Sequence, residues 1–378
     1  MTMKVIYVCG LIYIIAFLVT VIFVPLSIKL AHKINAIDIP KDDRRVHTRP
    51  IPRIGGVAIF TGITVALIFA ILTGLFSNGG IDKVTGIATM DFGYNYIEGA
   101  NVNKIIGVLI GGTLIFLIGL YDDLKDLNAK LKLCGQIISA GIVYAFGVRI
   151  QFTNFLFSDE VLHFGDAFSC IITILWIVAI TNTINLVDGL DGLASGIVAI
   201  AAFCIAYVGY IFGFYVGALP MLAIAGGCLG FLIFNFYPAK TFMGDCGSQY
   251  LGFMLASFSV LGTVKSATVV AVMIPSLAMF LPILDTTLAI IRRIANNRPV
   301  MEADKGHLHH RLLRSGMGQR RTVLCMYGVC GIMGTAAVLF SRELYVETIG
   351  LMAVAAMYVY VVLTDTNTKK PKLKEGKK

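Results

Sequence analysis

The sequence predicts an all-α fold, a polytopic membrane helical bundle with about 11 transmembrane helices. Of the 378 residues, 57% are apolar and only 14% are charged, which is far from the balance of a soluble domain. A transmembrane helix needs about 20 mostly apolar residues to cross a hydrocarbon core of about 30 Å. Runs of this kind recur along most of the chain, so a soluble globular protein is excluded.

The expected helices follow from these apolar runs in order. The first run is long enough to span, and polar residues from Lys29 follow it in place of a small-residue cleavage site, so we expect it to be retained. Polar residues or Gly and Pro bound the later runs. The eleven predicted spans are residues 5–28, 54–76, 104–121, 131–149, 167–184, 193–213, 216–236, 249–263, 267–291, 322–340 and 345–363.

We expect one transmembrane catalytic domain over residues 1–364 and a basic, disordered cytoplasmic tail over 365–378. The tail carries six Lys residues and suits attraction to anionic lipid. Lys and Arg residues elsewhere lie between the spans and not in a stripe interleaved with aromatic residues. Nucleic acid is therefore not an expected partner, whereas membrane lipids are.

The distribution of basic residues predicts the orientation. An odd number of spans places the two termini on opposite sides of the membrane. With the C-terminus inside, 25 of the 31 Lys and Arg residues fall on the cytoplasmic side and six on the other. Basic residues are enriched in cytoplasmic loops. We therefore expect the N-terminus outside, in a plasma-membrane protein.

Clusters of polar residues all fall on this predicted cytoplasmic face. At the inner end of the third span, the adjacent carboxylates of Asp122 and Asp123 suit a divalent cation or a substrate proton, and Lys125 suits a phosphate. A solvated helix end with internally paired charges is the alternative interpretation.

The segment that ends the fifth span spaces Asn185, Asp188 and Asp191 three residues apart, so a helix or a tight loop would place them on one face. Two carboxylates and an amide between apolar spans are costly unless they meet an ion, a partner or water. A polar turn with capping aspartates is the alternative.

Two further clusters lie in later loops, and a third precedes the second span. In the loop that contains Asn235, Asp245 and Ser248, an acid flanked by glycines suits a metal and phosphate oxygens. Near residue 310, His309, His310 and Arg311 suit an anionic substrate better than zinc, because no cysteines accompany the histidines and the two are expected on different sides of any regular element. Arg49, before a paired glycine, could hold phosphate at the lipid surface.

Together these segments resemble the polyprenyl-phosphate N-acetylhexosamine-1-phosphate transferases. The resemblance rests on RPIPRIGG, YDDLKD, NLVDGLDGLA, FNFYPAKTFMGDCGS and HLHHRLL, in that order. It is closest to the bacterial undecaprenyl-phosphate GlcNAc-1-phosphate transferases that initiate teichoic acid, O-antigen or related polymers. The branch that uses UDP-MurNAc-pentapeptide typically has HHHFE where this chain has HHRLL, which argues against that role.

The resemblance implies roles for individual residues. Asp245 would bind Mg²⁺, with Mn²⁺ as an alternative ion, and Asn185 would assist as a second ligand. Asp122 and Asp123 would activate the lipid phosphate. His309, His310 and Arg311 would hold the pyrophosphate and read the sugar. Asp188, Asp191, Asn235, Ser248, Lys125 and Arg49 complete the expected site, with Asp188 counted among the catalytic residues and the others as substrate-binding.

The implied reaction transfers GlcNAc-1-phosphate from UDP-GlcNAc to undecaprenyl phosphate and releases UMP, and a homodimer is compatible with the family. UDP-GalNAc or UDP-MurNAc-pentapeptide are alternative donors. Two other classes stay open: an Mg²⁺-dependent intramembrane prenyltransferase, because Asp122 to Asp126 also reads as DDxxD, and a transporter, because intramembrane acids often mark ion paths.

The predicted orientation can be tested by cysteine labelling in intact cells, after the native cysteines have been replaced. A cysteine at Asn297 should be shielded from a membrane-impermeant reagent, and one at Asn95 should react, because the basic loops are expected inside. Labelling of Asn297 but not Asn95 would invert the topology.

Overall fold

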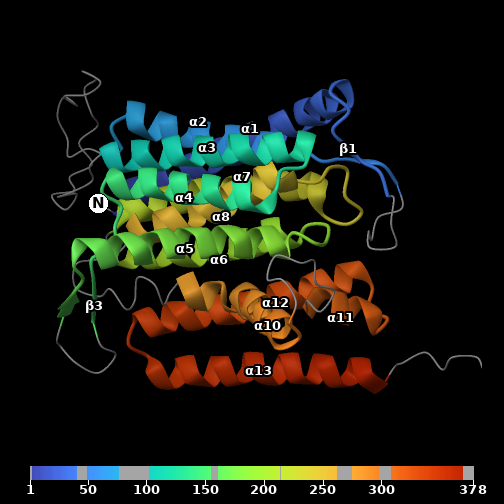
Figure 1. Cartoon of the computed structure of the whole chain (residues 1–378). Helices are drawn as coiled ribbons and strands as arrows, with labels where there is room; N and C mark the ends of the chain where they lie inside the picture. The colour runs from blue at the N-terminus through green and yellow to red at the C-terminus, as the bar shows by residue number, and fades with distance from the viewer. Residues whose placement is uncertain are drawn as a thin grey trace, which may run out of the picture.

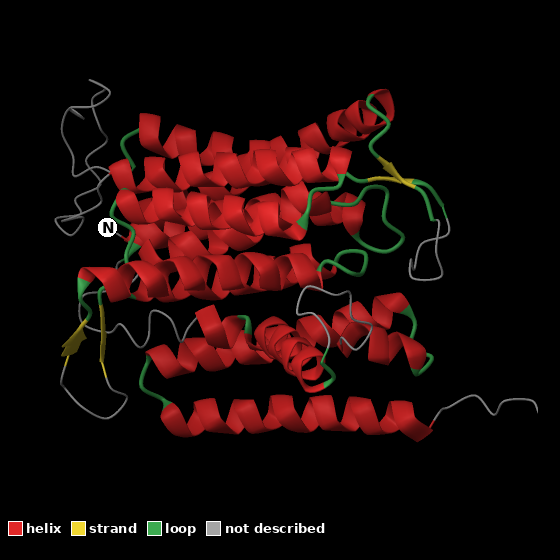
Figure 2. Cartoon of the chain, in the orientation of Figure 1, coloured by secondary structure: helices red, strands yellow, loops and turns green. Residues whose placement is uncertain are grey.

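A computed structural model describes residues 2–40, 49–75, 102–154, 161–212, 214–261, 275–297 and 308–368. The described part is dominated by helices (Figures 1 and 2). They are α1 (Thr2–Lys33), α2 (Gly56–Leu72), α3 (Val102–Lys125), α4 (Ala129–Ala145), α5 (Asp166–Val187), α6 (Leu193–Ile211), α7 (Tyr215–Asn235), α8 (Gly244–Leu261), α10 (Phe280–Ala295), α11 (Leu308–Arg314), α12 (Gln319–Ser341) and α13 (Tyr345–Thr368).

The long helices run side by side in two groups (Figure 1). Helices α1 to α8 form the larger group. Helices α10 to α13 form a second layer, in which α10 packs on α5, α12 packs on α6, and α13 packs on α12. Each of the eleven predicted runs overlaps one of the long helices.

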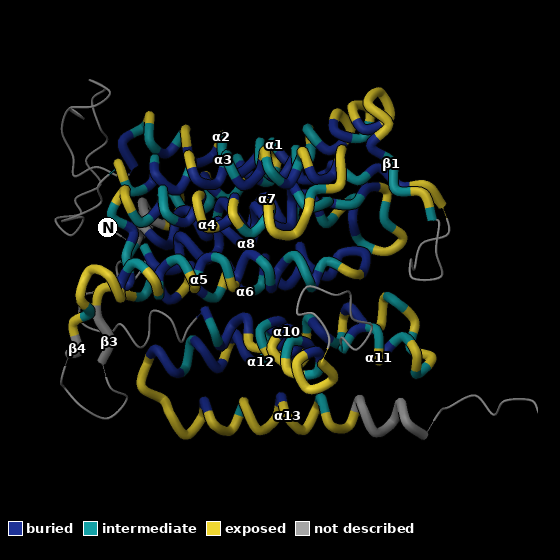
Figure 3. Tube along the Cα trace, in the orientation of Figure 1, coloured by how far each residue is buried: buried dark blue, intermediate teal, exposed yellow. Residues whose placement is uncertain are grey.

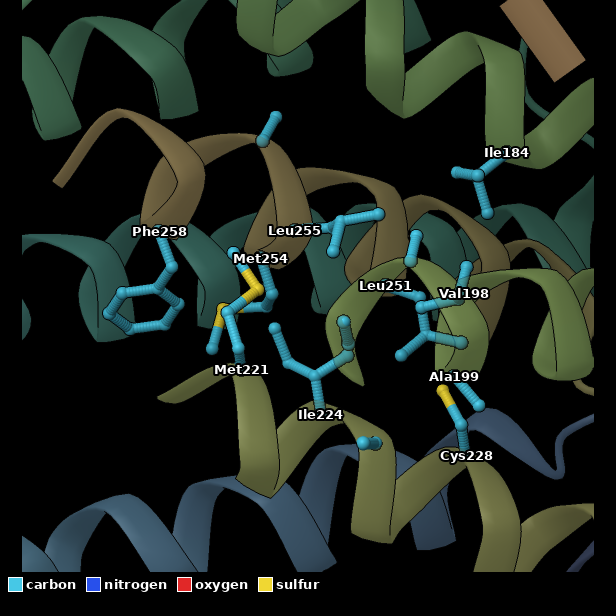
Figure 4. Packing of buried hydrophobic residues seen from close by; sticks show 14 of the residues in the cluster. Ile184, Val198, Ala199, Met221, Ile224, Cys228, Leu251, Met254, Leu255 and Phe258 are labelled. Atoms are coloured by element: carbon cyan, nitrogen blue, oxygen red, sulfur yellow. The ribbon is translucent and has the colours of Figure 1, made fainter. Parts of the chain in front are cut away.

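Helix α8 is the centre of the larger group. It packs against α2, α3, α5, α6 and α7, and every residue from Cys246 to Val260 is buried. A helix that is buried on all sides is expected to be apolar on all sides. In Figure 4, Leu251, Met254 and Leu255 of α8 face apolar residues of the neighbouring helices.

Glycines allow the neighbouring helices to approach α8 closely. A Cβ atom added to Gly119 of α3 would lie 2.7 Å from Cys246 Cα, and one added to Gly252 of α8 would lie 2.8 Å from Thr181 Cα of α5. Small residues at helix contacts are typical of membrane proteins, where close backbone packing replaces the hydrophobic effect between helices.

Outward faces of the bundle are apolar as well. Ile22 of α1 is 61% exposed, and Val346 of α13 is 81% exposed, and the tube of α13 is largely exposed in Figure 3. Within the described residues, six helices (α1, α3, α5, α6, α7 and α12) are long and apolar enough to cross a membrane. The chain is thus a multi-pass helical membrane protein, while the count of eleven spans stays a prediction.

The structure differs from the expected all-α fold in two small hairpins. Strand β1 (Ile37–Asp38) pairs antiparallel with β2 (Ile51–Pro52), and β3 (Phe152–Asn154) pairs antiparallel with β4 (Val161–His163). Strands of two or three residues are too short to show a period-2 pattern in the sequence. Helix α13 also continues to Thr368, past the expected domain boundary at 364, and residues 369–378 lie outside the described residues.

The first and last helices place the two ends of the described chain at opposite ends of the bundle. Helix α1 begins at one end, and α13 finishes at the opposite end, where β1 and α11 also lie (Figure 1). Termini at opposite ends agree with an odd number of crossings. Which end faces the cytoplasm remains the prediction made from the basic residues.

Candidate active site

The half-buried start of α8 organises the site. The first backbone N–H groups of a helix have no partner within the helix, and its N-terminus carries partial positive charge. The carboxylate of Asp123, from the last turn of α3, accepts hydrogen bonds from the backbone N–H of Asp245 and of Cys246, both at 3.0 Å. Asp123 therefore caps α8 from a different helix.

The segment before α2 closes over this cap. The guanidinium of Arg53 donates to Asp123 Oδ1 at 3.2 Å and 3.3 Å. The backbone around Arg53 pairs with the residues that lead into α8, since Phe242 N–H donates to Pro52 O and Gly55 N–H donates to Phe242 O, each at 2.8 Å. The RPIPRIGG segment is thereby fixed beside the GDCGS segment.

Gly244 is the residue that this geometry constrains most. Its φ is +68°, in the left-handed region that L side chains rarely adopt. A Cβ atom there would collide with the carbonyl oxygen of Arg53 and with Asp123 Oδ2. The glycine before Asp245 is thus a steric requirement of the capped helix start.

Asp122, the neighbour of Asp123, pairs with a lysine of α4. Lys132 Nζ lies 2.6 Å from Asp122 Oδ2 and 3.0 Å from Asp245 Oδ2, so one ammonium bridges two carboxylates. The other oxygen of Asp122 accepts the backbone N–H of Leu127 at 2.6 Å, just beyond the end of α3. Adjacent acids in the sequence thus point to different partners.

Two side chains hold the Asp245 carboxylate from its other sides. Asn185 Nδ2 donates to Asp245 Oδ1 at 3.2 Å and to Ser248 Oγ at 2.8 Å, and Gln249 Nε2 donates to Asp245 Oδ2 at 3.0 Å. Ser248 itself is buried and donates to Gly244 O at 3.0 Å. Its hydroxyl orients Asn185 and the first turn of α8.

The turn between α5 and α6 carries the other acids. Asp191 accepts the backbone N–H of Ala239 at 2.9 Å. The buried amide of Asn235 accepts from Gly192 N–H at 3.0 Å and donates to Thr241 O at 2.9 Å, so it ties this turn to the loop that precedes α8. Asp188 follows the last residue of α5.

The short helix α11 approaches the same turn. A Cβ atom added to Gly189 would lie 2.7 Å from His309 Nε2, so the buried His309 ring packs directly on this glycine. His310 lines the cavity described below. The ring centroids of His309 and His310 lie 4.3 Å apart. The two side chains are therefore closer together than expected from the prediction that they lie on different sides of a regular element. Asp285 of α10 accepts the backbone N–H of Leu308 at 2.8 Å and holds the start of α11.

These segments enclose a cavity of about 410 Å³ at one end of the bundle. Its lining comes from segments before α2, at the ends of α3 and α5, before and within the first turn of α8, and from α11 and α12. The lining residues are Asp38, Arg53, Asp123, Asn185, Asp188, Gly189, Leu190, Asp191, Asn235, Phe242, Gly244, Asp245, His310 and Gln319.

Acidic groups outnumber basic ones in the described part of this site. Burial of the Asp188 carboxyl, with the nearby charges of Asp245, Asp123 and Asp191, raises its pKa to about 8. A cavity of this charge repels a phosphate-bearing substrate unless a cation is also bound.

The donor set fits Mg²⁺ bound together with a substrate. Within the described ranges, no three His, Cys, Asp or Glu side chains form a group that could hold a metal alone. Mg²⁺ is usually bound through one or two carboxylates together with substrate phosphates and waters. The Asp245 carboxylate and the Asn185 amide, both lining the cavity, offer that partial set of oxygen ligands.

Most residues expected from the sequence lie in or against this cavity. Asp122, His309 and Ser248 contact residues near the cavity but are not among its lining residues. Three of the predicted basic residues do not line it either. Lys125, Arg49 and Arg311 are exposed and are not among the lining residues.

Sequence reasoning missed Arg53, Lys132 and Gln249. Arg53 lies in the same segment as Arg49, and Lys132 lies just across the α3–α4 connection from Lys125. The sequence therefore indicated basic groups in these segments, but not which of them points into the site.

Comparison with known proteins identifies the family of this chain. A family model described as glycosyl transferase family 4 matches residues 105–263. A probable undecaprenyl-phosphate N-acetylglucosaminyl 1-phosphate transferase of Bacillus subtilis (strain 168) is 33% identical over 362 residues, covering 96% of this chain and 93% of the relative. The chain belongs to the polyprenyl-phosphate N-acetylhexosamine-1-phosphate transferases.

Other relatives of this transferase differ in their substrates. A decaprenyl-phosphate N-acetylglucosaminephosphotransferase of Mycobacterium leprae is 35% identical, over 88% of this chain and 85% of the relative. A phospho-N-acetylmuramoyl-pentapeptide-transferase of Streptococcus pneumoniae serotype 2 is 34% identical, over 65% of this chain and 71% of the relative. The shared chemistry is sugar-1-phosphate transfer, and the resemblance seen in the sequence is confirmed.

Replacing the glycine that precedes Asp245 should disturb the site more than its size suggests. In the transferase, Gly244→Ala forces a side chain into positive φ and against Arg53 and Asp123, which costs about 1–3 kcal/mol in backbone strain alone. We expect a melting temperature lower by several degrees and loss of most turnover, measured on the purified protein.

Gly141→Ala in α4 is the matched control, because nothing lies within 4 Å of a Cβ there and Ala is favoured over Gly in a helix. Equal behaviour of the two variants would show that the start of α8 tolerates a side chain.

Proposed function

We propose that this enzyme transfers GlcNAc-1-phosphate from UDP-GlcNAc to undecaprenyl phosphate at the cytoplasmic face of the plasma membrane. The products are undecaprenyl-pyrophosphoryl-GlcNAc and UMP, the first membrane step of a cell-envelope polysaccharide such as teichoic acid or O-antigen. The observation that carries the proposal is the near full-length similarity to the Bacillus subtilis protein. Similarity to the pentapeptide transferase covers only 65% of the chain, which favours the GlcNAc donor.

The nucleotide pyrophosphate is proposed to bind over the start of α8. Asp245 and Asn185 would hold Mg²⁺, or Mn²⁺, which when bound neutralises the phosphate charge and polarises the bond that breaks. The partial positive charge at the N-terminus of α8 points in the same direction. Asp188 and Asp191, which line the cavity from the α5–α6 turn, would contact the nucleotide, and His310, which also lines it, would contact the pyrophosphate or the sugar.

The lipid phosphate is proposed to enter from the side of the bundle. One of its oxygens attacks the β-phosphorus of UDP-GlcNAc, a new P–O bond forms, and the bond from that phosphorus to the oxygen bridging to the α-phosphorus breaks, so UMP leaves with the electron pair. Among the described residues, Lys132 pairs with Asp122 and Arg53 pairs with Asp123. In this proposal Asp122 and Asp123 keep them in place, beside any role in accepting a proton from the lipid phosphate. Arg311, which is exposed, would have to turn inward to contact the pyrophosphate.

The names of the relatives exclude two of the alternative function classes that the sequence left open. Their shared sugar-1-phosphate transfer sets aside the prenyltransferase and transporter interpretations. The other UDP-sugars remain as competing donors, and they can be separated directly.

The purified protein in detergent with undecaprenyl phosphate and Mg²⁺ should release UMP from UDP-GlcNAc. Parallel reactions with UDP-GalNAc and UDP-MurNAc-pentapeptide should be slower by at least about tenfold in kcat/KM, which corresponds to about 1.4 kcal/mol of discrimination. Faster UMP release from either competitor would reassign the donor, and no release from any of the three would sink the proposal.

Neutralising Asp245 should abolish most of the Mg²⁺-dependent turnover. Asp245→Asn keeps the shape but loses a charged ligand, and we expect kcat/KM to fall by on the order of 100-fold or more, because partners one shell further out already cost about 10–100-fold. The measurement is a Mg²⁺ titration of UMP release. Asp166→Asn, at the start of α5 and outside the cavity lining, is the control and should behave as wild type. A near-normal rate and Mg²⁺ response in Asp245→Asn would contradict the ligand assignment.

A further inference from the structure

A row of three buried or half-buried amide side chains lies behind Asp245, away from the cavity. Asn182 of α5 donates through Nδ2 to Gln136 Oε1 at 2.7 Å. Gln136 of α4 donates through Nε2 to Gln249 Oε1 at 3.2 Å. Gln249 of α8 donates through Nε2 to Asp245 Oδ2 at 3.0 Å. None of the three amides lines the cavity, so they make no part of the substrate surface described above.

The hydrogen bonds run in one direction. Asn182 Nδ2 also donates to the backbone carbonyl of Val178 at 2.8 Å, which fixes which way its amide points. Its Oδ1 accepts from Gln136 Nε2 at 3.3 Å, so the orientation of Gln136 is fixed in turn. Gln136 then presents a donor to Gln249 Oε1, which leaves the Gln249 amide nitrogen facing Asp245. The row therefore delivers a donor, and not an acceptor, to the carboxylate.

The cost of this arrangement argues against a passive filler. Gln136 and Gln249 are 3% and 1% exposed, and α8 is otherwise buried on all sides. A buried amide costs free energy unless its donors and acceptors are satisfied, and an apolar side chain of the same size would avoid that cost. An amide at position 249 therefore indicates that its hydrogen bond to Asp245 contributes something that an apolar side chain could not.

We propose that Gln249, oriented by Gln136 and Asn182, is a positioning residue that holds the Asp245 carboxylate in the orientation that binds the divalent cation. The inference rests on the proposed metal role of Asp245. Lys132 occupies the same oxygen, Oδ2, and Asn185 contacts Oδ1, so the carboxylate is held from three sides by α4, α5 and α8. Hydrogen-bond partners of metal-binding carboxylates orient them and preserve affinity.

The first test removes the donor and keeps the volume. Binding of Mn²⁺ is measured on the full-length purified protein with UMP at one fixed concentration, because UMP supplies the phosphate oxygens that the partial ligand set lacks. The free ion is followed by its electron paramagnetic resonance signal, against a protein-free sample of Mn²⁺ and UMP. In Gln249→Met the Kd should rise about tenfold, within the range seen for lost outer-shell partners. Ser257→Ala, two turns further along α8, is the control, because that buried hydroxyl has no hydrogen-bond partner among the described residues. Its Kd should equal that of wild type.

The second test reverses the direction of the row and needs no change at position 249. Gln136→Glu presents only acceptors once its carboxyl is ionised, and burial opposes ionisation by raising a carboxyl pKa, so this variant is measured at alkaline as well as neutral pH. In the ionised form, the Gln249 amide must turn its nitrogen toward the new carboxylate and its oxygen toward Asp245. Gln136→Leu removes the contact without reversing it. We expect Mn²⁺ binding to weaken more in Gln136→Glu than in Gln136→Leu, and we expect Gln136→Leu to add less than twofold when Gln249 is already Met. This non-additivity distinguishes a connected row from separate packing effects.

The outcomes separate this inference from the proposed function. A wild-type Kd in Gln249→Met, equal binding in Gln136→Glu and Gln136→Leu, or fully additive losses would each overturn the positioning role. If Gln249→Met does not fold, the two Gln136 variants decide alone. If the wild-type protein binds Mn²⁺ and the variants lose it as expected, but UDP-GlcNAc yields no UMP, the positioning role stands and the donor assignment fails.

Discussion

The start of helix α8 imposes the constraint on which the site depends. The first N–H groups of a helix have no partner within the helix, so another part of the chain must supply an acceptor where they are buried, as at Cys246. Asp123 supplies it, Gly244 makes room for it, and Arg53 balances its charge. These three contacts bring α3, the segment before α2 and the loop after α7 to one point. The polar cavity is the space that remains around that point.

Charge then explains why the same point suits phosphate chemistry. The carboxylates that cap and surround α8 concentrate negative charge beside the positive end of a helix, with Lys132 shared between Asp122 and Asp245. In the proposed function such a site would bind an anionic substrate together with a cation, which would link nucleotide binding to metal binding. The His309 and His310 helix completes the wall from the second layer of the bundle, where its start is held by Asp285 of α10.

Composition and spacing predicted the helical membrane fold and several of the residues that meet in the site. Asn185, Asp188 and Asp191 all line one cavity as their spacing suggested, although a turn after α5 and not one helix face brings them together. Lys132 could not be distinguished from Lys125, because its partner Asp245 is 113 residues away and only the folded bundle, in which α4 packs on α3 and α5, brings the two together. Asn235 was predicted to bind substrate and does line the cavity, and its amide is also engaged by Gly192 and Thr241, which a sequence cannot show.

The bridge that Lys132 makes has a consequence for the fold when no metal is bound. A small domain built around a structural metal stays unfolded until the ion arrives, because metal binding supplies much of the free energy of folding. Here an internal ammonium already acts as the counter-ion between Asp122 and Asp245. The bundle therefore needs no divalent ion to balance these two carboxylates, so removal of the ion proposed to bind Asp245 would stop turnover while the fold persists.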